Sequence, residues 1–85
     1  MARGEKLLQR MRDNPHDWRI QDVEALCLWL DLAFERPRGG SHYGVSDPTQ
    51  RHHVTVPFRR PIKGVYIRQL VRFVDAVRAA REDRT

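Results

Sequence analysis

Two segments with apolar residues at helical spacing flank a middle region of short strands, and this arrangement constrains the fold more than any other feature. The first segment predicts a helix from about Ile20 to Leu32, and the second predicts a helix from about Gly64 to Ala80. Between them, Arg38-Gly39-Gly40 and Ser46-Asp47-Pro48-Thr49 have the composition of turns. Because each helix has one apolar face to bury, we expect both helices to cover one face of a sheet in an α+β protein.

Three strands are expected in the middle region, connected as an antiparallel meander. They run from Ala33 to Arg36, from Ser41 to Val45 and from His52 to Pro57. Alternation along the strands directs four side chains toward the core, namely Tyr43, Val45, Val54 and Val56. The same alternation leaves His42, Gly44 and Thr55 on the opposite face. We therefore expect a two-layer sandwich with a three-stranded antiparallel sheet whose open face is available for a ligand.

A shorter helix, from Glu5 to Arg12, is expected before this unit, because Asn14-Pro15 ends helical geometry. The 85 residues allow one domain with one small core. We expect this single domain to comprise a short N-terminal helix within residues 1–15 and a core within residues 18–80.

The charge of the chain favours an anionic partner. Its 16 lysines and arginines against 11 acidic residues give a net charge of +5, and nucleic acid is the commonest partner of such a protein. The single cysteine, Cys27, lies in the apolar stripe of the first long helix, so we interpret it as a core residue and expect no internal disulfide. No apolar run has the length of a membrane span, and charges occupy the N-terminal segment. We therefore expect a cytoplasmic protein without a cleaved signal and without a membrane partner.

Two segments suggest RNA chemistry: the motif Gly39-Gly40-Ser41-His42 and, starting 15 residues after His42, the basic segment Pro57-Phe58-Arg59-Arg60-Pro61-Ile62-Lys63. A neutral imidazole can take a proton from a ribose 2′-hydroxyl, and nearby cations can hold the phosphate that is attacked. His42 is therefore the candidate catalytic residue, although on spacing alone a surface histidine with no function is an equally good interpretation. The candidate RNA-binding residues are Arg38, Ser41, Arg59, Arg60, Lys63 and Arg68. No metal site is expected, because His52 and His53 are adjacent in a strand and point to opposite faces.

An ordered set of residues between Trp18 and Val77 carries a family resemblance. The set includes Trp18-Arg19-Ile20, Asp22-Val23, Gly40-Ser41-His42, Val54-Thr55-Val56-Pro57, Arg60-Pro61-Ile62-Lys63 and Tyr66-Ile67-Arg68-Gln69-Leu70. It resembles the HicA family of mRNA interferases, the toxins of prokaryotic HicA/HicB toxin–antitoxin pairs. One departure is Gly44, which stands where family members usually have a β-branched or aromatic residue, and glycine weakens a strand.

The resemblance implies a double-stranded-RNA-binding-domain-like α-β-β-β-α fold and metal-independent cleavage of mRNA by an endoribonuclease, without a cofactor. It makes His42 the essential residue. It also implies a HicB-type antitoxin as protein partner, with operator DNA contacted only indirectly through that antitoxin.

The expected mechanism uses His42 as general base on a 2′-hydroxyl, which attacks the adjacent phosphate and leaves a 2′,3′-cyclic phosphate. A cation such as Lys63, Arg59 or Arg60 would stabilise the phosphorane. No second histidine is clearly placed as general acid, although His52 or His53 could serve.

Two other functions remain open from the sequence. One is a non-catalytic RNA-binding module of the same fold that reads A-form shape, and the other is a small DNA-binding regulator. Trp29 points away from the apolar stripe of its helix, which makes it a candidate for a protein contact. The outward Arg68 and Arg72 are candidates for that contact or for the RNA path.

Overall fold

The computed structural model describes residues 3–83, which form an α+β protein with a three-stranded antiparallel sheet. The elements in chain order are α1 (Arg3–Asp13), α2 (Ile20–Leu30), β1 (Ala33–Glu35), β2 (His42–Ser46), β3 (Val54–Pro57) and α3 (Gly64–Asp83). The predicted order of a short helix, a second helix, three strands and a final helix is confirmed. None of the helices in residues 3–83 combines the length and apolar character needed to cross a bilayer.

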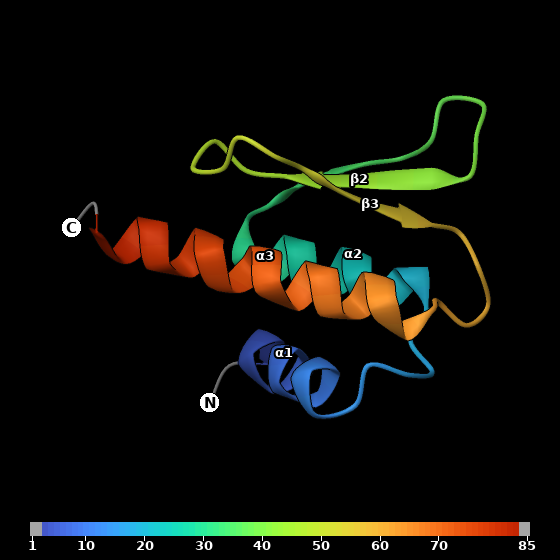
Figure 1. Ribbon diagram of the computed structural model, residues 1–85, viewed down its shortest axis with the longest axis horizontal. Coiled ribbons are helices and arrows are strands. Elements are labelled where there is room, and N and C mark those ends of the chain that lie inside the picture. The colour runs from blue at the N-terminus through green and yellow to red at the C-terminus, as the bar shows by residue number, and fades with distance from the viewer. Residues whose placement is uncertain (1–2, 84–85) are drawn as a thin grey trace.

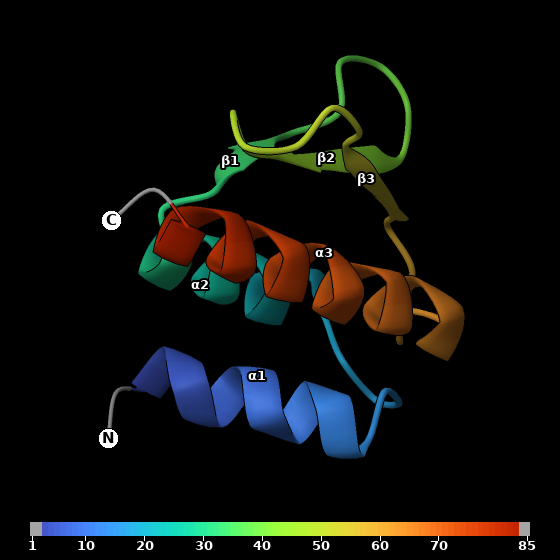
Figure 2. The ribbon, with the colours of Figure 1, turned by 60° about the vertical axis from the view of Figure 1, so that its left-hand side comes forward.

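The helices lie on one side of the sheet (Figure 1). β2 is the central strand, α2 contacts β1, and α3 contacts β3. α1 packs against α2 and α3 on their far side, away from the sheet (Figure 2). The sheet and the α2–α3 layer therefore form the predicted sandwich, and α1 adds a further layer behind it.

The apolar stripes predicted from the sequence are the buried faces of α2 and α3. The buried positions of these stripes are Ile20, Val23, Leu26, Cys27, Leu30, Ile67, Leu70, Val71, Val74 and Val77. Val45 of β2 and Val56 of β3 join the same core from the sheet, and Leu8 and Met11 join it from α1. Each such side chain stabilises the fold by about 1.5–3 kcal/mol relative to an exposed position.

The register of β2 against β3 places the side chains predicted to face the helices on that side, and those predicted to face away on the other. The pairs on the helix-facing side are Tyr43–Val56 and Val45–Val54. The pairs on the opposite side are His42–Pro57 and Gly44–Thr55. Val45 and Val56 are fully buried, whereas His42 and Thr55 are exposed. β2 runs from His42 to Ser46 and continues through Gly44, so the glycine leaves the strand intact.

Every element differs from its prediction at one end or both: α1, β1 and β2 differ by one or two residues an end, and α2, β3 and α3 by two or three. α2 ends at Leu30 because Asp31 adopts a left-handed conformation with φ 56°, and its N–H bonds carbonyl groups of the last turn. β3 begins at Val54 rather than His52, because the chain bends at Arg51 and His52 before it pairs with β2. α3 continues past Ala80 to Asp83. The additional turn includes Arg81, whose side chain reaches Asp47 in the turn after β2.

Trp29 packs on α1. Its ring lies so close to Gly4 that a methyl group on Gly4 would overlap it. The side chain keeps 39% exposure, and the neighbouring Leu28 is 78% exposed. The outward direction of Trp29 therefore has an explanation within the chain, because the ring helps to hold α1 against α2.

Candidate functional site

A polar hollow of about 280 Å³ lies where β2 begins, β3 ends and α3 starts. The residues lining it are Ser41, His42, Pro57, Phe58, Arg59, Lys63 and Tyr66. Four of the residues predicted from the sequence therefore meet in one place: Ser41, His42, Arg59 and Lys63. His42 is exposed, so its imidazole is accessible to a ligand from solvent.

Backbone hydrogen bonds hold the two sides of the hollow together. The N–H of Phe58 donates to the carbonyl of Ser41 at 2.6 Å, which extends the β2–β3 pairing beyond the ends of the strands. The loop that follows is tied down where the N–H of Ile62 donates to the carbonyl of Trp18 at 2.9 Å. Lys63 comes next in the chain, directly before α3. These bonds fix the path of the chain on both sides of Arg59 and Lys63.

Among the residues that the structure describes, no acid lines the hollow beside its positive charge. The hollow includes Arg59 and Lys63, and none of the described residues that line it is a carboxylate. Four ion pairs lie elsewhere in the described part of the chain, at Arg12–Asp75, Arg36–Glu24, Arg78–Glu5 and Arg81–Asp47. The first turn of α3 contains no acidic residue, so the partial positive charge of its N-terminus adds to that of Lys63. The arrangement suits an anion such as a phosphate.

Three predicted RNA-binding residues lie outside this hollow. Arg38 is exposed in the loop between β1 and β2, which stands out from the sheet (Figure 2). Arg60 lines a separate hollow next to Pro61, and its guanidinium lies over the ring of Phe58, 5.6 Å from the centroid. Arg68 lines a third hollow between α1 and α3. The structure therefore brings Arg60 to the edge of the site and leaves Arg38 and Arg68 apart from it.

The remaining histidines of the strand region lie far from His42. His42 pairs with Pro57, and His53 precedes Pro57 by four residues, just before β3, which is about 13 Å at the usual rise per residue. His53 instead lines a hollow with Glu35, so neither His52 nor His53 is placed as a general acid for His42. Within residues 3–83, no group of three or more potential ligand side chains is placed to hold a metal ion.

Two aromatic residues of the hollow were not predicted from the sequence. Phe58 is 42% exposed, and Tyr66 is half-buried with its ring packed against the core. Tyr66 follows Lys63 by three positions, and such spacing brings two residues to the same side of a helix. Because the sequence predicts that α3 starts at Gly64, this spacing could have shown that Tyr66 lies beside Lys63.

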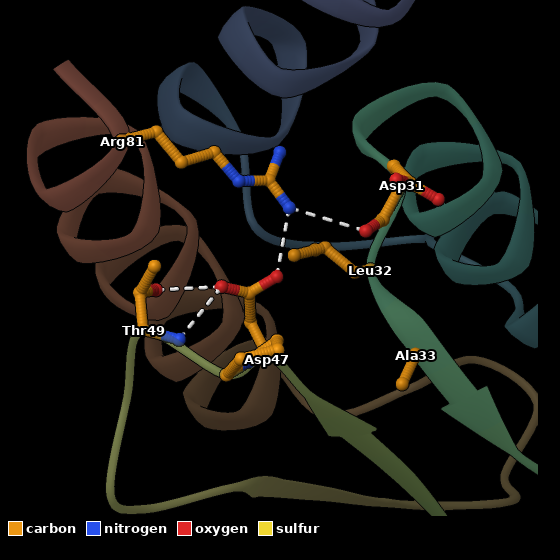
Figure 3. Close-up of a pocket in the computed structure, with 7 residues that line it drawn as sticks. Asp31, Leu32, Ala33, Asp47, Thr49 and Arg81 are labelled. Atoms are coloured by element: carbon orange, nitrogen blue, oxygen red, sulfur yellow. Dashed lines mark hydrogen bonds and ion pairs between the residues drawn. The ribbon is translucent and has the colours of Figure 1, made fainter. Parts of the chain in front are cut away.

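A larger hollow, of about 450 Å³, lies at the opposite end of β2 (Figure 3). There Arg81 of α3 donates to the carbonyl oxygens of Leu30 at 2.6 Å and Asp31 at 3.1 Å, and forms a 2.7 Å ion pair with Asp47. The second carboxylate oxygen of Asp47 accepts hydrogen bonds from the hydroxyl and the N–H of Thr49. Because these groups satisfy one another, we interpret this hollow as structural despite its greater volume.

Asp47 and Cys27, both outside the His42 hollow, have pKa values shifted by their surroundings. Burial alone would raise the pKa of Asp47, but hydrogen bonds from Thr49 and the ion pair with Arg81 outweigh it and lower the pKa below its ordinary value. Burial, with a smaller effect of Glu24, raises the pKa of Cys27 to about 12. Cys27 is therefore a buried thiol at neutral pH, which confirms its interpretation as a core residue rather than a nucleophile.

Comparison with protein-family models, with curated proteins and with solved structures finds no match for this chain. The residues of the hollow and their surroundings therefore carry the functional argument.

Proposed function

We propose that this protein is a metal-independent endoribonuclease that cleaves mRNA in the cytoplasm of a prokaryote, with His42 as general base. The observation that most supports this function is the meeting of His42, Arg59 and Lys63 in an open polar hollow whose described lining residues include no carboxylate. A group that takes a proton and cations that hold a phosphate are what this reaction requires.

In the proposed reaction, the imidazole of His42 removes the proton of a ribose 2′-hydroxyl. The 2′-oxygen bonds to the adjacent phosphorus, and the bond from phosphorus to the 5′-oxygen breaks. The departing oxygen takes a proton from water, and the resulting hydroxide takes the proton held by His42, which restores the neutral imidazole. The products are a 2′,3′-cyclic phosphate and a 5′-hydroxyl. Lys63 and Arg59 stabilise the negative charge on the non-bridging oxygens. Because the nucleophile belongs to the substrate and already lies near the phosphorus, few protein groups are needed.

We also infer that α2, the three strands and α3 form a double-stranded-RNA-binding-domain-like fold, with α1 as an addition. The element order α-β-β-β-α supports this inference. An unrestrained ribonuclease would damage its own cell, so the proposed function includes a HicB-type antitoxin as partner. An acidic surface on that partner would complement Arg59 and Lys63 and cover His42.

The test uses a long RNA in EDTA with the wild type, His42→Ala and His53→Ala. His53 is an exposed histidine outside the hollow, so its variant controls for the loss of any imidazole. We expect the wild type and His53→Ala to cleave at similar rates and His42→Ala to be slower by about 10²–10⁴-fold. Intact RNA with all three proteins, together with salt-sensitive binding, would contradict the enzyme and favour a non-catalytic RNA-binding module.

A further inference from the structure

The ring of Phe58 is an exposed aromatic surface inside the His42 hollow. It is 42% exposed and lines the hollow together with His42 and Lys63. Its backbone is fixed, because the N–H of Phe58 donates to Ser41 at 2.6 Å. The position of the ring is thus set by strand pairing rather than by a free loop.

Phe58 is also the exposed end of a row of aromatic rings. Phe34 and Tyr43 stack with centroids 5.3 Å apart, and Tyr43 meets Phe58 at 6.2 Å in a tilted arrangement. Phe34 and Tyr43 are partly buried and pack against the core. The row supports Phe58 from within, so a ligand that stacks on the ring loses little conformational freedom of the protein.

The guanidinium of Arg60 lies over the Phe58 ring, 5.6 Å from its centroid. Arg60 has no carboxylate partner among the ion pairs of residues 3–83. A cation–π contact at an exposed site is weaker than the stacking of a nucleobase on an aromatic ring. A base can therefore replace Arg60 on the ring, and the displaced guanidinium is then available for a phosphate.

We propose that Phe58 stacks an unpaired base next to the phosphate held at His42, an inference that rests on the proposed function. The substrate is then single-stranded RNA. Bases of a duplex are stacked on their own neighbours and do not reach such a ring, whereas unpaired bases stack readily on aromatic side chains. The site then recognises the backbone through Arg59 and Lys63 and recognises single-strandedness through Phe58.

The binding test compares two uncleavable probes of equal length and charge. One is a 2′-O-methyl-uridine dodecamer, which lacks the nucleophile, and the other is a 2′-O-methyl dodecamer of the same length in which hydrogen replaces each base at C1′. Each is titrated with the wild type, Phe58→Ala, Phe58→Trp and Leu28→Ala, the last removing an exposed apolar side chain of α2 as a matched control. We expect Phe58→Ala to bind the uridine probe about 5- to 150-fold more weakly, with unchanged affinity for the abasic probe. Phe58→Trp retains the preference for the base-bearing probe.

Unchanged affinity of Phe58→Ala for both probes would overturn the inference and leave the exposed ring as a contact for a protein partner. Cleavage separates this outcome from a failure of the proposed function. If His42→Ala abolishes cleavage but Phe58→Ala cuts a single strand and its annealed duplex as the wild type does, the enzyme stands and the role of Phe58 is wrong. If the wild type cuts neither substrate yet Phe58→Ala loses the base-dependent affinity, stacking on Phe58 stands and the enzyme is wrong.

Discussion

The guanidinium of Arg81, in the last turns of α3, lies 2.7 Å from the carboxylate of Asp47 in the turn after β2. The Asp47 side chain is 4% exposed, and Arg81 also bonds the carbonyl oxygens at the end of α2. One side chain thus links the last helix, the sheet and α2 at the end of the molecule opposite the His42 hollow. The Arg81–Asp47 contact, which stabilises the fold, therefore lies at the other end of β2 from the hollow to which we assign the chemistry.

Arg81→Ala should lower the free energy of unfolding by about 2 kcal/mol, because it leaves a buried carboxylate without its cation. Arg78→Ala is the matched control, since Arg78 forms a 3.3 Å pair with Glu5 and both side chains are more than 40% exposed. That exposed pair should contribute less than about 1 kcal/mol. Urea unfolding of the two variants provides the measurement. Equal losses would contradict the structural role of Arg81.

The stability of the protein should fall as the solution is acidified. Asp47 and Asp75 have pKa values below their ordinary range in the folded state, so the unfolded chain binds protons first as the pH falls. Their contribution is present above the unfolded pKa and is lost progressively below about pH 5. Asp47→Asn removes the contribution of Asp47 to this pH dependence. The free energy of unfolding of the variant should therefore fall less steeply than that of the wild type between about pH 5 and pH 3. Parallel curves for wild type and variant would show that Asp47 has no such effect.

Lys63→Ala and Arg59→Ala should weaken RNA binding and reduce its salt dependence, because each removes a cation from the hollow. On single strands, each lost phosphate contact should lower the slope of log affinity against log salt by about 0.7. Arg68→Ala serves as the control, since Arg68 lines a different hollow between α1 and α3. Fluorescence anisotropy at several salt concentrations measures the slopes. A larger change for Arg68→Ala than for Lys63→Ala would move the RNA path to the α1 side of the molecule.

The thiol of Cys27 should resist modification in the folded protein. Burial raises its pKa to about 12, so the reactive thiolate is scarce at neutral pH and reagents have little access. Reaction with a disulfide reagent such as DTNB should be slow in buffer and rapid in denaturant. Fast modification in buffer without loss of structure would place Cys27 at the surface.

Much of the fold could be predicted from the sequence because it depends on local periodicity. The stripe from Ile67 to Val77 and the alternation around Val45 are direct readings of helical and strand geometry, and both are the buried faces in the structure. Gly64 as the start of α3 followed equally from the pattern. These features need no knowledge of which segments meet.

The features that were missed depend on contacts between distant segments. Asp47 reads as an ordinary turn residue until Arg81, 34 residues later, is brought beside it. Trp29 reads as an exposed residue until Gly4 is placed against its ring. The hollow was predicted in part, since the Ser41-His42 motif and the basic run are visible in the sequence, but Phe58 acquires its place only through strand register.

The most direct test of the central claim is the chemical identity of the RNA ends. A long RNA is incubated in EDTA with the wild type or with His42→Ala, and the fragments are analysed by mass spectrometry and by their reaction with enzymes specific for each type of end. The account predicts 2′,3′-cyclic phosphate and 5′-hydroxyl ends with the wild type and intact RNA over the same period with His42→Ala. Fragments with 5′-phosphate ends, or equal cleavage by both proteins, would contradict the role of His42 as the base that activates the 2′-hydroxyl.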